Sequence, residues 1–204
     1  MARMDHMHPY EHLSLFTVGL ILAFWLIGSH ALMLAKPAIV QGALKKFPRN
    51  AIAGQVLLGI GLGWFWLLIA PEGLDKLSAL AMDLGEFNAA KPILRILVPV
   101  SLVLVTLSVR DFLAVRALGM LGLLVASPLL ESAFLKDPST RLLVPLFAYG
   151  LLTASLFLVG MPYLFRDAIA WVTADQKRWT ACSLAGLCYG VATLVCACAF
   201  WRAY

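Results

Sequence analysis

Charge is scarce in this chain and is missing from most of its longest apolar runs. Only 13% of the 204 residues are Asp, Glu, Lys or Arg, whereas 62% are hydrophobic. A soluble domain carries about 25% charged residues, which cover its surface. The deficit argues against an ordinary water-soluble protein and indicates that most of the surface faces lipid. The length suits one bundle of helices, so we expect a single membrane domain over residues 1–204.

Cysteines outside the apolar runs and the usual catalytic signatures are both absent. The four cysteines lie between residues 182 and 198, in the last apolar run, so no disulfide framework is expected outside the membrane. The sequence contains no Walker loop, dinucleotide fingerprint, HExxH pair or GxSxG turn. We therefore expect no catalytic residue, and no motif assigns a cofactor.

Long apolar runs are the dominant feature. The first, residues 13–34, has 22 residues and no formal charge. A helix of this length reaches about 33 Å, enough to cross a hydrocarbon core of about 30 Å. We predict an all-α integral membrane bundle of about six transmembrane helices, because such runs recur along the chain. The expected spans are residues 13–34, 51–70, 93–109, 117–135, 142–165 and 179–201.

The connection at residues 72–91 differs in kind from these runs. Its apolar residues recur at helical spacing between acidic ones, which predicts one short amphipathic helix lying on the membrane surface. Long ordered connections often carry function. This segment is therefore a candidate partner contact, although a capping role without a partner explains it equally well.

Small residues at four-residue spacing mark three of the predicted helices. Such pairs let two helix backbones approach closely, and a nearby amide can form a hydrogen bond between helices. We expect protein partners or self-association through these faces, in addition to contact with the lipid bilayer. The candidate packing and polar positions are Gly19, Ala23, Gln55, Gly59, Gly63, Gly186 and Gly190.

His30 is the strongly polar residue of the first run and shares a helix stripe with Gly19 and Ala23. An ionisable group inside a membrane is a functional hypothesis by default, and a neutral imidazole can bind haem iron or a chlorophyll magnesium. A bis-histidine haem needs a second histidine on a facing helix, and no histidine follows residue 30. We therefore favour a hydrogen-bonded packing histidine, with cofactor binding as the alternative.

Charged side chains at the ends of the runs form another set of candidates. Two Arg-Asp dipeptides, at 110–111 and 166–167, fall at the same predicted side and could pair across the bundle. Glu131 is expected near the opposite interface, within reach of Arg141 or Lys136. Arginine at helix ends is what membrane topology demands, so a structural role is favoured over lipid-phosphate chemistry. The candidate cluster is Arg110, Asp111, Arg116, Arg166, Asp167, Glu131 and Arg141.

The distribution of positive charge predicts the orientation of the chain. Residues 36–50 carry four Lys or Arg and no acid, which favours a cytoplasmic location for that loop and an external one for both termini. The positive charges behind the net charge of +5 lie in short loops. Retention of positive loops in the cytoplasm and contact with anionic lipid headgroups explain them there, so we expect no binding of nucleic acid. We expect a bacterial cytoplasmic membrane.

Three functions are compatible with these patterns. The first is a non-catalytic subunit, scaffold or assembly factor of a membrane complex. The second is a haem- or pigment-binding redox anchor using His30, and the third is a small-solute transporter or channel. We favour the first, because the glycine faces and the acidic connection both suit contact with partners.

Overall fold

The part of the chain that the structure describes is predominantly helical and contains no strand. The computed structural model describes residues 8–71, 75–108 and 112–204. Within them, six helices are long and apolar enough to cross a membrane. They are α1 (Leu15–Ala35), α3 (Ala51–Leu68), α4 (Lys91–Ser108), α5 (Leu113–Ala133), α6 (Leu143–Gly160) and α8 (Gln176–Phe200). The predicted all-α membrane bundle is confirmed, and the chain is a polytopic integral membrane protein.

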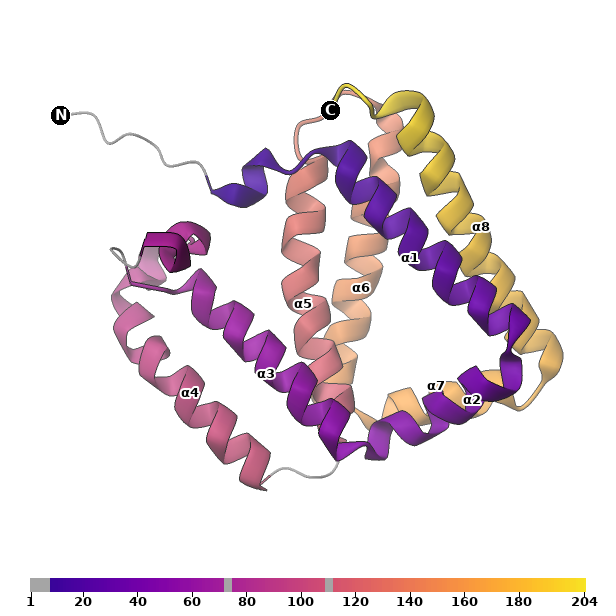
Figure 1. Cartoon of the computed structure of the whole chain (residues 1–204), viewed down its shortest axis with the longest axis horizontal. Helices are drawn as coiled ribbons and strands as arrows, with labels where there is room; N and C mark the ends of the chain where they lie inside the picture. The colour runs from indigo at the N-terminus through magenta and orange to yellow at the C-terminus, as the bar shows by residue number, and fades with distance from the viewer. Residues whose placement is uncertain (1–7, 72–74, 109–111) are drawn as a thin grey trace.

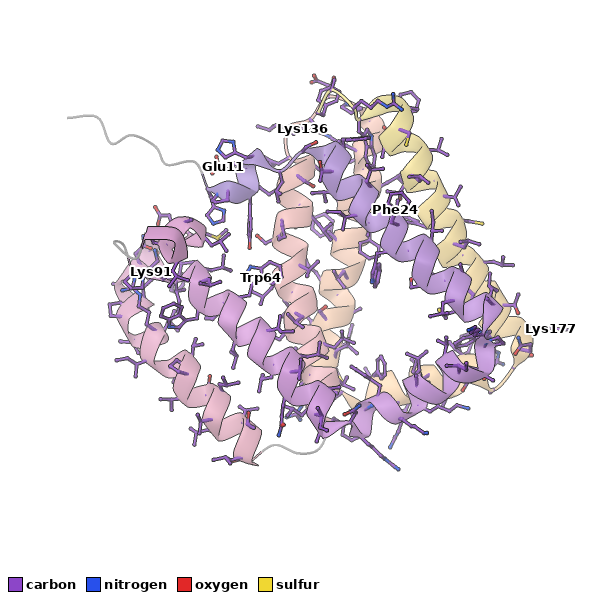
Figure 2. The ribbon with its side chains drawn as sticks, viewed as in Figure 1. Glu11, Phe24, Trp64, Lys91, Lys136 and Lys177 are labelled. Carbon is purple, nitrogen blue, oxygen red and sulfur yellow. The ribbon has the colours of Figure 1, made fainter. Side chains whose placement is uncertain are left out.

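The spanning helices are arranged in pairs (Figure 1). The most extensive helix contacts join α1 to α8, α5 to α6 and α3 to α5. α4 lies outermost, and Val98 is the one buried side chain within its described residues. The α5–α6 pair therefore separates α3 and α4 from the α1–α8 pair (Figure 1). Figure 2 shows Glu11 and Lys136 beyond one end of the bundle, and Lys177 at the other.

The helix boundaries follow from local chemistry. The side chains of Ser14, Asn50 and Asp175 accept hydrogen bonds from backbone N–H groups in the first turns of α1, α3 and α8. These caps satisfy donors that have no partner inside the helix. α6 stops at Gly160 rather than at the predicted residue 165, because Pro162 disfavours helical backbone at the residue before it.

Two short helices lie where the sequence predicted loops. α2 (Pro37–Lys46) follows α1, and α7 (Tyr163–Thr173) precedes α8. The start of α7 overlaps the end of the span predicted over residues 142–165, and the rest of it lies in the predicted loop. The two short helices contact each other across one end of the bundle (Figure 1). Phe47 directly follows α2 and Phe165 lies early in α7, and the centroids of their rings are 5.8 Å apart. α2 ends in Lys45 and Lys46, so this end of the bundle combines apolar packing with positive charge.

The segment at residues 72–91 is not the single amphipathic helix that its pattern predicts. Its described part forms two 3-10 helices, η3 (Asp75–Leu80) and η4 (Gly85–Ala90). Gly85 adopts a left-handed conformation with φ of +58°, which interrupts any continuous right-handed helix and which glycine tolerates best. Between the two helices, the backbone N–H of Met82 donates to the carbonyl of Leu68 at 2.8 Å. The segment is thereby folded back onto the end of α3.

Glycines permit the closest helix contacts. A Cβ atom added at Gly54 of α3 would lie 2.8 Å from the backbone nitrogen of Ala114 in α5. One added at Gly119 of α5 would lie 2.9 Å from the carbonyl oxygen of Ser155 in α6. Real Cβ atoms do not approach backbone atoms this closely, so the α3–α5 and α5–α6 spacings both require glycine.

We predict that Gly54→Ala lowers the free energy of unfolding by about 1–3 kcal/mol, because the added methyl group forces two backbones apart. Gly59→Ala is the matched control on the same helix, since nothing lies within 4 Å of a Cβ atom there. Denaturant unfolding in detergent micelles measures both variants. Equal stability of the two would contradict this packing.

Candidate functional site

An open groove of about 520 Å³ lies between α1, α6 and α8. Its lining is almost entirely apolar and includes the aromatic side chains of Trp25, Phe147 and Tyr189. His30 contributes an imidazole to the same wall. A mainly apolar concavity with a small number of polar groups is the usual form of a small-molecule site. We call this feature the His30 groove.

The aromatic side chains connect the three helices around the groove. Phe147 of α6 lies between Trp25 of α1 and Tyr189 of α8, with ring centroids 6.2 Å and 6.4 Å away respectively. The hydroxyl of Tyr189 donates to the carbonyl oxygen of Leu143 at 2.6 Å. This hydroxyl is therefore satisfied by α6, and the ring remains part of the groove wall.

The imidazole of His30 is half-buried and held in one orientation. Its Nδ1 atom lies 2.8 Å from the carbonyl oxygen of Leu26, and 3.2 Å from Oγ of Ser29. A carbonyl oxygen accepts hydrogen bonds and never donates them, so Nδ1 carries the proton in the neutral ring. Nε2 is then a hydrogen-bond acceptor, and it has no partner among the described residues.

Gly186 positions this ring. A Cβ atom added there would lie 2.1 Å from Nε2, 2.2 Å from Cδ2 and 2.5 Å from Cε1 of His30. Nearly equal distances to three ring atoms mean that the face of the imidazole, and not its edge, rests on the glycine. Gly190 makes a similar approach to Leu26 and Ile27. The Gly186–Gly190 pair of α8 therefore lies against α1.

Gly19 also faces the α1–α8 interface, and Ala23 lies one turn further along the same stripe of α1. Both are buried, and a Cβ atom added at Gly19 would lie 2.5 Å from the indole ring of Trp201. The Trp201 indole is itself fully buried and donates its N–H to Oγ1 of Thr140 at 2.9 Å. These small residues let a large aromatic ring close the end of the bundle.

The outward side of α3 presents a second surface. Gln55 and Gly63 are exposed there, and nothing lies within 4 Å of a Cβ atom added at Gly59 or Gly63. The opposite side of the same helix packs tightly, because a Cβ atom at Gly61 would meet the methyl group of Met120 at 2.6 Å. We call Gln55, Gly59 and Gly63 the outer stripe of α3.

The charged candidates do not form one site in the described structure. Arg166 and Asp167 form an exposed ion pair with each other at 2.9 Å, and Arg116 is exposed on α5. Arg110 and Asp111 lie outside the described residues.

At the opposite end of the bundle, Glu131 is half-buried. The guanidinium of Arg141 donates to the carbonyl oxygen of Ala133 at 3.4 Å. In the described ranges, no ion pair joins Arg141 to Glu131. Those ranges also contain no group of three His, Cys, Asp or Glu side chains that could hold a metal ion.

Sequence reasoning did not anticipate the role of Arg95. Its Nε and Nη2 atoms donate to the carbonyl oxygens of Ile69 at 2.6 Å and Ala70 at 3.1 Å. Carbonyls that follow the end of α3 are thereby satisfied by a side chain of α4. The signal was an arginine placed early in an apolar run, but its target depends on how α3 and α4 pack.

The N-terminal segment is also tied to this end of the bundle. The indole N–H of Trp64 donates to the hydroxyl of Tyr10 at 2.6 Å, and Nε2 of His8 lies 3.0 Å from the carbonyl oxygen of Leu80. Burial raises the pKa of the Tyr10 hydroxyl above its ordinary value, and the hydrogen bond from Trp64 acts in the opposite direction. The residues before α1 therefore fasten the 72–91 segment to α3.

Comparison with known proteins gives no match to a protein family, a curated protein or a solved structure.

We predict that nitrogen NMR of histidine-labelled protein, recorded under alkaline conditions in which imidazole is neutral, shows the proton of the His30 ring on Nδ1. The reason is the hydrogen bond from this atom to Leu26. The spectrum of His30→Phe assigns the signals by difference. A proton on Nε2 of the neutral ring would contradict the geometry.

Proposed function

We propose that this protein is a non-catalytic subunit, scaffold or assembly factor of a membrane complex. Its partner is a transmembrane helix that docks on the outer stripe of α3. The docked helix places small residues opposite Gly59 and Gly63, and a side-chain hydrogen-bonding group opposite Gln55. The complex lies in a bacterial cytoplasmic membrane, with both termini of this chain outside.

The observation that carries this proposal is the exposed amide of Gln55 beside two open glycines. An amide that faces hydrocarbon without a hydrogen bond is costly, and a hydrogen bond between membrane helices contributes about 0.6–2 kcal/mol. Small residues at Gly59 and Gly63 allow the partner backbone to approach closely enough to form it. The stripe therefore offers both close packing and a hydrogen bond to an incoming helix.

Charge supports the proposed orientation. Residues 36–50, 110–116 and 166–178 carry nine of the 16 Lys and Arg but three of the 11 Asp and Glu, which leaves seven bases and eight acids elsewhere. Positive loops are retained in the cytoplasm. α2 lies within residues 36–50, and most of α7 lies within residues 166–178. Both helices are amphipathic and suit the anionic surface of the inner leaflet.

The position of Gly186 bears on the alternative of a haem or pigment anchor. A macrocycle whose metal is bound by Nε2 lies perpendicular to the Nε2–metal bond. It is much wider than the imidazole and therefore extends past both faces of that ring. The backbone of α8 at Gly186 already occupies the space over one face of that ring. This position of α8 disfavours a macrocycle on that side of His30, and we favour the subunit function over the anchor and over a transporter or channel.

The test combines photo-cross-linking with matched glycine variants. A photoreactive residue at Ile60, which is 54% exposed beside the stripe, should cross-link in native membranes to a transmembrane peptide of another protein. Gly63→Leu should abolish that cross-link, because the larger side chain keeps the partner helix away. The thermal stability of the purified chain should not fall, since a Cβ atom added at this position has no atom of its own protein within 4 Å.

Gly28→Leu is the control variant, because Gly28 of α1 also has nothing within 4 Å of an added Cβ atom. This variant should keep the cross-link. Cross-links to lipid or to a second copy of this chain would overturn the proposed heteromeric subunit. A cross-link that survives Gly63→Leu would do the same.

A further inference from the structure

We propose that the His30 groove binds a quinol, the reduced and hydroxyl-bearing form of a lipid-soluble quinone. A ligand hydroxyl donates to Nε2 of His30, and the ligand ring lies among the aromatic side chains of the groove. This site is formed by α1, α6 and α8. It goes beyond the proposed subunit function, which depends on α3, and either can hold without the other.

Nε2 of His30 is a hydrogen-bond acceptor. The proton on Nδ1 is directed to Leu26, so Nε2 presents a lone pair and accepts a hydrogen bond. The groove around it is almost entirely apolar, and an acceptor in such surroundings gains most from a ligand that brings its own donor. A quinol has an O–H donor, whereas the carbonyl oxygens of the oxidised quinone can only accept. The site therefore selects the reduced form.

The shape and lining of the groove suit an aromatic ligand. Its volume of about 520 Å³ falls within the range of small-molecule pockets. Trp25, Phe147 and Tyr189 provide ring surfaces against which a planar aromatic head group can pack. The groove is open on one side between spanning helices, so a ligand with an isoprenoid tail can enter from the hydrocarbon layer.

The space beside Nε2 is limited on one side. Gly186 covers one face of the imidazole, so a ligand donor has to approach Nε2 along its in-plane lone pair. A hydroxyl group places a single oxygen atom in that direction. Gly150 of α6 also lines the groove, and a Cβ atom added there has nothing within 4 Å. The space next to Gly150 is therefore open to the ligand ring.

The test measures binding of decylubiquinol and decylubiquinone to the purified full-length chain in lipid nanodiscs, by calorimetry under anaerobic conditions. Decylubiquinol should bind about tenfold more tightly, which corresponds to one hydrogen bond in an apolar site. His30→Phe keeps an aromatic ring of similar size but removes the acceptor. In this variant, decylubiquinol should bind only as tightly as decylubiquinone. The affinity for decylubiquinone should be nearly the same in His30→Phe and in the unmodified protein.

Two further variants keep the test decisive. Gly150→Leu adds an apolar side chain to the groove wall, at a position where an added Cβ atom has nothing within 4 Å, and should weaken binding of both probes. His12→Phe changes a histidine outside the groove and should leave both affinities unaltered. Thermal unfolding of each variant separates loss of the site from loss of the fold. Equal affinity for the two probes, a preference that survives in His30→Phe, or a haem-type absorption band that disappears in that variant would each overturn the proposal.

Discussion

The hydrocarbon core of a membrane offers no hydrogen bonds, and this constraint governs the rest of the structure. Every backbone N–H and C=O inside it must find a partner within the protein, which is why the spanning segments are helices of 18 residues or more. Groups left over at helix ends are satisfied at the edges of the bundle. Ser14, Asn50 and Asp175 cap N-termini, and Arg95 binds the carbonyls beyond the end of α3.

A second consequence concerns how the helices are held together. Between lipid-facing helices there is no hydrophobic driving force of the kind that folds soluble proteins, so close van der Waals packing replaces it. The α1–α8 interface illustrates this, because Gly186 and Gly190 bring the α8 backbone against His30 and Leu26. Orientation of the imidazole is therefore a product of helix packing as well as of its hydrogen bond to Leu26.

Much of the fold could be predicted from the sequence because its physical signals are local. Long uncharged runs mark the spans, and residues such as Ser14 and Asn50 mark where helices begin. α2 and α7 could not be predicted in this way, since their charged residues and short lengths resemble ordinary loops. The break at Gly85 was also hidden, because helical spacing in the 72–91 segment says nothing about the backbone conformation of one glycine.

The contacts of the candidate sites could not be predicted from local sequence patterns. Gly59–Gly63 and Gly186–Gly190 are the same pattern in the sequence, yet the second pair contacts α1 and the first faces outward. Which side of a helix meets a neighbour depends on tertiary packing that spacing does not encode. His30 was visible as a polar residue in an apolar run. Its tautomer follows from a hydrogen bond within α1, whereas the groove beside it became clear only from the atoms of α6 and α8.

We expect the chain to thread the membrane with α2 and α7 on one side and its C-terminus, together with the α5–α6 connection, on the other. Labelling of single cysteines with a membrane-impermeant maleimide tests it most directly, in a variant lacking the four native cysteines. We expect Ala43→Cys and Ala174→Cys to react only in inside-out vesicles, and Asp137→Cys and Ala203→Cys only in intact cells. Reaction of residues 43 and 203 from the same side of the membrane would contradict the account.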